Sequence, residues 1–135
     1  MDSVLVVDDH SDARAALRAF LAKEPYDINE AADAEEALHV LSASPVAVVV
    51  CDKFMPGKDG LWLILQIRKL RPDVAIVIAS ADDSILPVFT LQAGIIGYFV
   101  KPLDFDKVRD AIREGIAWHH AAKTAALTTQ LSQNR

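Results

Sequence analysis

The chain has 135 residues, of which 52% are hydrophobic and 24% are charged, and this length and composition are typical of one globular domain. Nineteen acidic against fourteen basic side chains give a formal net charge of −5 without any cluster of lysine and arginine, which argues against nucleic-acid binding by this domain alone. No apolar run approaches membrane-spanning length, and the chain starts directly with a strand-like segment that leaves no room for a signal peptide, so we expect a cytoplasmic protein without membrane contact.

Five segments along the chain have the character of β-strands. Four of them are short, continuous apolar runs rich in β-branched residues, which are typical of strands buried on both faces of a sheet. They comprise residues 4–7, 46–51, 74–79 and 96–100. The more polar residues 26–30 predict a fifth strand at an edge of the sheet.

The segments between and after the strands predict five amphipathic helices, because their apolar side chains recur every three or four residues. These helical faces cover residues 13–21, 34–41, 61–67, 84–93 and 105–116. Asp33 and Glu36 have the spacing of a capping box at the start of the second helix, and Gly94 suits the position that follows the fourth.

Strands and helices that alternate in this way predict an α/β fold, in which five βα units form a doubly wound, five-stranded parallel sheet with helices on both faces. We assign residues 1–120 to this domain. Residues 121–135 are small and polar, and we expect them to prolong the last helix or to form a linker. Such sheets bind ligands beyond the carboxyl ends of their strands, so the functional residues are expected there.

Three carboxylates are predicted at this end of the sheet. Asp8 and Asp9 follow the first strand, and Asp52 ends the most apolar one. Taken alone, the first pair is equally well explained by helix capping and Asp52 by a solvated strand end. Together they offer the hard oxygen ligands that Mg²⁺ prefers. A carboxylate fixed at a strand tip can also attack phosphorus and form an acyl phosphate.

Two more strands end in side chains that suit a phosphate site. Ser80 ends the fourth strand, where capping is the simpler explanation, and Lys101 ends the fifth, where an ordinary surface lysine is the simpler one. In a phosphate site, the hydroxyl would donate a hydrogen bond to a phosphoryl oxygen and the ammonium would neutralise its charge. Pro102 indicates a fixed peptide bond, open to the cis form, that orients the lysine. Tyr98 either belongs to the core or swings between buried and exposed positions.

With these residues in this order, the chain resembles the receiver (CheY-like) domain of two-component response regulators over residues 2–120. The motifs that carry the resemblance are Asp8-Asp9, Asp52 with the loop 53–60, Ser80-Ala81, Ala93-Gly94 and the segment 97–102. The resemblance implies a flavodoxin-like topology with strand order 2-1-3-4-5. It also implies a signalling domain with self-directed phosphoryl transfer and autodephosphorylation, and not an enzyme that turns over a small molecule.

The same resemblance implies how the acceptor and the metal are arranged. Asp52 would be phosphorylated by a histidine kinase, a phosphotransfer protein or a small phosphodonor. Mg²⁺ (or Mn²⁺) would be held by Asp9, by Asp52 and by the backbone carbonyl oxygen of Phe54. Asp8 would act on the metal through water.

The resemblance also implies a switch. Lys101 and Ser80 would contact the phosphoryl group, and Ser80 would move toward it while Tyr98 turns inward. This pair would reshape the surface formed by the fourth helix, the fifth strand and the fifth helix, and so control a partner or an output domain. Lys53 and Asp82 occupy positions that tune the rate of dephosphorylation in this family.

The predicted fourth helix has an unusual composition, because no charged residue occurs between positions 84 and 100. Not all of its large apolar side chains can face the core, so we expect a patch used for a homodimer or for docking an output domain. Shielding of the helix by neighbouring loops is the alternative. The patch comprises Ile85, Leu86, Val88, Phe89 and Leu91.

Three other functions share part of this pattern. Phosphatases similar to haloacid dehalogenases also use a strand-end aspartate, but they carry a second aspartate two residues later, where this chain has Phe54. A flavodoxin-like redox protein would need a loop rich in Ser, Thr and Gly after the first strand, and this loop is acidic. A purely structural module would not need the acidic set.

Two further features have simple structural interpretations. Cys51 lies in an apolar run and is expected to be a buried, inert thiol. His119 and His120 are expected to be a solvated helix end and not a metal site, because adjacent side chains on a helix point about 100° apart.

Overall fold

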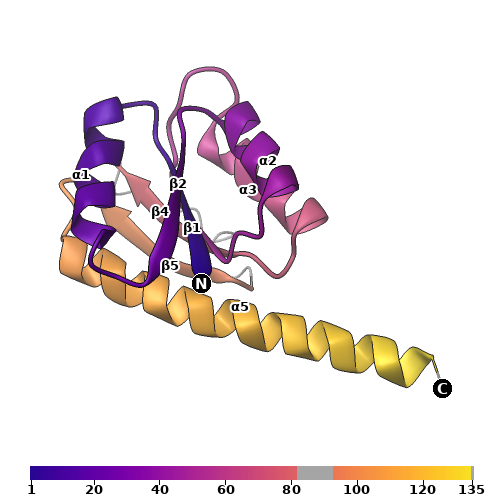
Figure 1. Ribbon diagram of the computed structural model, residues 1–135. Coiled ribbons are helices and arrows are strands. Elements are labelled where there is room, and N and C mark those ends of the chain that lie inside the picture. The colour runs from indigo at the N-terminus through magenta and orange to yellow at the C-terminus, as the bar shows by residue number, and fades with distance from the viewer. Residues whose placement is uncertain (82–92, 135) are drawn as a thin grey trace.

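The computed structural model describes residues 1–81 and 93–134, and it has a five-stranded parallel sheet at its centre (Figure 1). The strand order is β2-β1-β3-β4-β5, which confirms the predicted α/β fold, its topology and the edge position of the polar strand. The strands are β1 (Asp2–Val7), β2 (Tyr26–Ala31), β3 (Val48–Asp52), β4 (Ala75–Ser80) and β5 (Ile95–Val100). The predicted fourth helix and its apolar side chains, from Ile85 to Leu91, lie outside the described residues.

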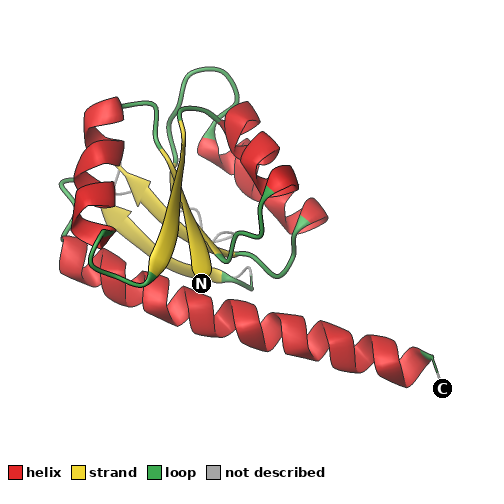
Figure 2. Cartoon of the chain, viewed as in Figure 1, coloured by secondary structure: helices red, strands yellow, loops and turns green. Residues whose placement is uncertain are grey.

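Four described helices cover the two faces of the sheet, α1 and α5 on one and α2 and α3 on the other (Figure 2). They are α1 (Ser11–Leu21), α2 (Ala34–Ala43), α3 (Gly60–Leu70) and α5 (Phe105–Gln133). Half of the predicted capping box forms at α2, where Asp33 Oδ1 accepts from Glu36 N at 2.8 Å. Glu36 Oε2 accepts at 3.2 Å from the N–H of Ala32, one residue before the N-cap, and not from that of Asp33. None of the described helices is long and apolar enough to cross a membrane.

The core has two halves because successive side chains of a strand point to opposite faces of the sheet. On β1, Leu5 and Val7 face α2 and α3, whereas Val4 and Val6 face α1 and α5. The same alternation holds along β3 and β4, whose residues are all buried. Strands buried on both faces need continuous apolar runs, which explains why these segments were recognisable in the sequence.

The last helix extends well beyond its predicted apolar face, which ends at residue 116. Of the two alternatives for the residues after 120, the structure shows the prolonged helix: α5 continues without interruption to Gln133, and its second half projects away from the sheet (Figure 1). Residues 117–133 contain five alanines and neither glycine nor proline, so nothing in their sequence ends the helix. Beyond Ala122, every described residue of this helix is exposed.

One expectation for α5 was wrong. His119 is not solvated but buried, with its Nδ1 2.7 Å from the backbone oxygen of Asp73 in the turn before β4. His120 is exposed and lies 2.8 Å from Asp2 Oδ1. The polar partner in the turn compensates for burial of the imidazole, and sequence periodicity cannot reveal such a partner. Cys51 is buried as expected, and burial is the main cause of the raised pKa of its thiol.

Candidate functional site

The register of the sheet brings the predicted site residues together at the carboxyl ends of the strands. Val7 of β1 pairs with Cys51 of β3, so the next residues along the two strands, Asp8 and Asp52, are neighbours. On the other side, the backbone N–H of Lys101 donates to the carbonyl oxygen of Ser80 at 2.7 Å. Parallel strands in this order therefore place all four residues at their carboxyl ends, as the fold predicted.

An acidic cluster lies at this edge. Oxygen atoms of Asp8, Asp9 and Asp52, together with a ring nitrogen of His10, lie within 4.8 Å of one another. Asp8 and Asp52 are buried, whereas the side chain of Asp9 is 25% exposed. Carboxylates held so close repel one another, and the nearby cation described next compensates for only part of that charge.

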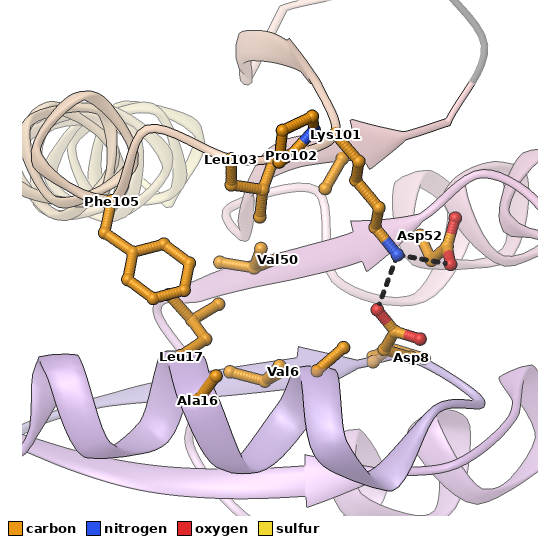
Figure 3. A pocket seen from close by; sticks show the side chains of 13 residues that line it. Val6, Asp8, Ala16, Leu17, Val50, Asp52, Lys101, Pro102, Leu103 and Phe105 are labelled. Carbon is orange, nitrogen blue, oxygen red and sulfur yellow. Dashed lines mark hydrogen bonds and ion pairs between the residues drawn. The ribbon is translucent and has the colours of Figure 1, made fainter.

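Lys101 lies between two of the carboxylates (Figure 3). Its Nζ is 2.8 Å from Asp8 Oδ2 and 3.0 Å from Asp52 Oδ2. Burial alone would lower the pKa of this ammonium, but the hydrogen bonds and the charges of the two carboxylates outweigh burial, and the pKa is raised. The lysine therefore stays charged at any ordinary pH. The peptide bond from Lys101 to Pro102 is cis, one of the forms that the sequence allowed.

The loop after Asp52 is tightly shaped. The N–H of Phe54 donates to Asp52 Oδ1 at 3.1 Å, which orients the carboxylate. Gly57 has a φ of +77°, a left-handed conformation that favours glycine. The loop ends where Asp59 caps α3 by accepting from Trp62 N at 3.0 Å. At Gly60, an added Cβ would lie 2.3 Å from the carbonyl oxygen of Asp52, so the first turn of α3 touches the strand end directly.

The two predicted switch residues lie beside this loop. Ser80 is completely buried at the end of β4. Tyr98 on β5 is partly buried against the α2–α3 half of the core. Lys53 is buried, and its Nζ lies 5.2 Å from the ring centroid of Phe54 and 5.9 Å from that of Tyr98. This cation–π arrangement links the loop after Asp52 to β5.

Two neighbours of the cluster were missed in the sequence. His10 Nδ1 lies 3.4 Å from Asp8 Oδ1 and 3.3 Å from Asp9 Oδ1, although 72% of its side chain is exposed. Arg14 donates to the backbone oxygen of Asp8 at 2.6 Å. The position of His10 directly after two aspartates was a usable signal, whereas the contact of Arg14 depends on a rotamer that sequence does not determine.

The acidic cluster fits a hard divalent cation. Asp9 Oδ1 is buried and accepts no hydrogen bond from the described residues, which leaves its lone pairs available. Carboxylate oxygens on two adjacent strand ends suit Mg²⁺, which takes few protein ligands and retains water. An imidazole nitrogen is the softer ligand of the group, so the three aspartates decide the preference.

Comparisons with known proteins identify the family of this chain. The family model of the response regulator receiver domain matches residues 4–113. The transcriptional regulatory protein ZraR of Salmonella typhimurium is 32% identical over 124 residues, which is 91% of this chain and 28% of ZraR, so the chain spans less than a third of that relative. A CheY-like receiver domain protein from Methanospirillum hungatei has a TM-score of 0.82 and 25% identity over 90% of this chain and 98% of its own. Response regulator TrrA from Thermotoga maritima, in complex with Mg²⁺-BeF, has a TM-score of 0.73 and 30% identity over 85% of this chain and 99% of its own.

Proposed function

The chain belongs to the response regulator receiver family of two-component signal transduction, and on that premise we propose that Asp52 is its phosphoryl acceptor. The observation that carries the proposal is the position of Asp52, which is buried at a strand tip, oriented by the N–H of Phe54 and paired with Lys101 at 3.0 Å. Asp8 and Asp9 lie beside it but follow a different strand. Their proposed role is to bind the metal.

The proposed reaction is an in-line phosphoryl transfer. A carboxylate oxygen of Asp52 attacks the phosphorus of a phosphohistidine or a small acyl phosphate, a new P–O bond forms, and the leaving nitrogen or oxygen departs with its electron pair. Lys101 offsets charge on the phosphoryl oxygens and Ser80 donates a hydrogen bond to them. Bound Mg²⁺, or Mn²⁺, held by Asp9, Asp52 and the carbonyl of Phe54, with Asp8 acting through water, would supply further charge compensation.

The transfer would act as a switch. Once Asp52 is phosphorylated, Ser80 moves toward the new group and Tyr98 turns inward, which alters the surface of β5 and α5. Hydrolysis of the acyl phosphate returns the domain to its starting state, and this autodephosphorylation is the only turnover that we propose. The position of Lys53, between the rings of Phe54 and Tyr98, supports a connection from the acceptor loop to β5.

The partners follow from the family. Receiver domains work with histidine kinases or phosphotransfer proteins, and we propose one of these, in a cytoplasmic setting, as the phosphodonor. ZraR is more than three times as long as the segment that this chain matches, and it is a transcriptional regulatory protein. We therefore propose that the switched surface controls an output domain or a partner protein, with the apolar residues Ile85, Leu86, Val88, Phe89 and Leu91 as its docking face.

Substitution of the acceptor tests this function. Incubation with acetyl phosphate and Mg²⁺ should add one phosphoryl group to the wild-type chain, observed as a mass increase by intact-protein mass spectrometry. Asp52→Asn should abolish the addition, because an amide cannot form the acyl phosphate. The control is Asp12→Asn, which changes an exposed aspartate on α1 and should leave the mass increase intact. Phosphate that stays attached to the Asp52→Asn chain would assign the acceptor elsewhere.

A further inference from the structure

An apolar recess lies beneath the acidic cluster. It has a volume of about 210 Å³ and lies between α1, the ends of β1, β3 and β4, and the turn that joins β5 to α5 (Figure 3). Its wall is mostly aliphatic and aromatic, and the residues that matter here are Ala13, Ala16, Leu17, Val50, Leu103 and Phe105. Figure 3 shows Leu17, Leu103 and Phe105 at one end of the space and the charged side chains at the other.

The recess exists because α1 carries small side chains where it crosses the end of the sheet. Leu17 and Leu21 fill the space under the rest of the helix and are buried. Ala13, one turn before Leu17, and Ala16, the residue directly before Leu17, reach less far, so the gap between α1 and the β5–α5 turn stays open, and Ala16 is exposed at its mouth. The space is therefore built by side-chain size and is accessible from solvent.

The other end of the recess is polar. Asp8, Asp52 and Lys101 line it, and the two carboxylates each accept from the same ammonium. Two negative charges face one positive charge, so the local balance is negative, and Asp9 adds to it. Without a metal ion on the aspartates, a bound molecule should therefore carry a cationic or hydrogen-bond-donating head, and an anionic head should be repelled.

We propose that this recess binds a small molecule that has an apolar, aromatic-sized body and an amine head group directed at Asp8 and Asp52. The volume supports that size, because an apolar cavity of about 150 Å³ is enough for benzene. The binding itself does not depend on the proposed phosphorylation. The regulatory consequence does rest on the proposed phosphorylation. A ligand that touches Asp52, Lys101 and the turn at Leu103 changes the affinity for the phosphoryl group. Phosphorylation then changes the affinity for the ligand by the same factor.

Methyl NMR of the unphosphorylated chain, without Mg²⁺, tests the site with two matched probes. 2-Phenylethylamine and 3-phenylpropionate have the same aromatic body and opposite head charges. The amine should shift the methyl resonances of Leu17, Val50 and Leu103 in a saturable way. It should bind at least about tenfold more tightly than the carboxylate, which corresponds to about 1.4 kcal/mol. Absence of saturable shifts at millimolar amine, or equal affinity for the two probes, overturns the proposal.

Two variants of α1 control for the location. Ala16→Leu fills the recess and should weaken amine binding at least about tenfold. Ala15→Leu makes the same change on the exposed face of the same helix and should leave it unchanged. Unaltered binding by Ala16→Leu would place the amine elsewhere and overturn the proposal. Shifts of the same methyl groups on raising the protein concentration without any probe would show that a second copy fills the recess, and would also overturn it.

The probe titration contains no phosphodonor, so its outcome is separate from that of the acceptor test. Amine binding in a chain that accepts no phosphate would leave the recess assigned and remove its regulatory role. Phosphorylation without amine binding would leave the receiver function intact and remove the ligand site.

Discussion

Lys101 is the residue on which the charge balance of the site depends. Its ammonium is shared by Asp8 and Asp52, and a raised pKa keeps it charged. Replacement by methionine retains the length of the side chain and removes the charge. The carboxylates of Asp8 and Asp52 would then face each other without this compensation. An incoming phosphoryl group, itself an anion, would meet a more negative site.

We therefore predict that Lys101→Met lowers the rate of phosphorylation by acetyl phosphate about a hundredfold, the size of effect seen when one stabilising donor is removed from a charged transition state. Mass spectrometry over time gives the rate. Mg²⁺ binding, followed by isothermal titration calorimetry, should persist in the variant because all three aspartates remain. The control is Lys107→Met, which removes an exposed lysine on α5. A variant that reacts at the wild-type rate would show that Lys101 only maintains the structure.

For single residues, the sequence predicts the site best where a charged residue stands at the end of a predicted strand. Asp8, Asp9, Asp52 and Lys101 follow apolar runs, so the sheet topology alone brings them together. Contacts that depend on a long side chain's rotamer were not predictable. An example is the approach of Lys53 to the rings of Phe54 and Tyr98, because Tyr98 lies 45 positions further along the chain.

The element that shapes the loop after Asp52 is the start of α3, and two glycines there, Gly57 and Gly60, have different roles. Gly57 has a positive φ and open space where a Cβ would lie, so alanine there costs only backbone strain. Gly60 has no space at all, because a Cβ would lie 2.3 Å from the backbone oxygen of Asp52 and 2.8 Å from Cα of Lys53. Backbone atoms cannot rotate aside as a flexible side chain would.

We predict that Gly60→Ala lowers the free energy of unfolding by about 2–3 kcal/mol through overpacking and that Gly57→Ala lowers it by about 1 kcal/mol. Urea denaturation of the two variants beside the wild-type chain measures both. The Gly60 variant should also lose phosphorylation, since α3 must retreat from the strand end that carries Asp52. Equal losses of stability for the two variants would mean that the first turn of α3 has room to move.

The boundaries of elements were less predictable than their existence. The second apolar run starts at residue 46, but β3 starts at Val48, and Val46 and Ala47 are buried in the connection that precedes it. An apolar run indicates which residues are buried, but a buried residue can belong either to a strand or to the end of a loop that other residues cover. For α5 the reverse holds: a helix persists where burial has ended, because alanine-rich sequence favours the helix without any packing.

Across the whole molecule, the two ends of the strands have different roles. The acidic cluster lies at the carboxyl ends, whereas at the amino ends a side chain donates hydrogen bonds to backbone carbonyl oxygens. Arg68 of α3 donates to the carbonyl oxygens of Pro72, Val74 and Ala93 and lies against the ring of Trp118. These contacts connect α3, the start of β4, the start of β5 and α5. The family resemblance implied the order of the strands, but this second network joins residues too distant in sequence to be predicted from spacing.

The exposed half of α5 gives the last prediction, which concerns the extent of the domain. We propose that the domain ends near residue 120 and that the rest is an extension that packs little. From Lys123 onward all described residues are exposed, including Leu127 at 58% and Leu131 at 61%. Removal of residues 124–135 should therefore change the free energy of unfolding by less than about 0.5 kcal/mol, as is usual for surface changes. The far-UV circular dichroism should fall, because helical residues are lost.

Ile112→Ala, in the buried half of the same helix, is the contrasting variant and should lower the free energy of unfolding by about 2–4 kcal/mol. Urea denaturation with both probes compares the three chains. A truncated chain that loses more than about 1 kcal/mol would extend the domain into the projecting helix, because only packed residues can contribute that much.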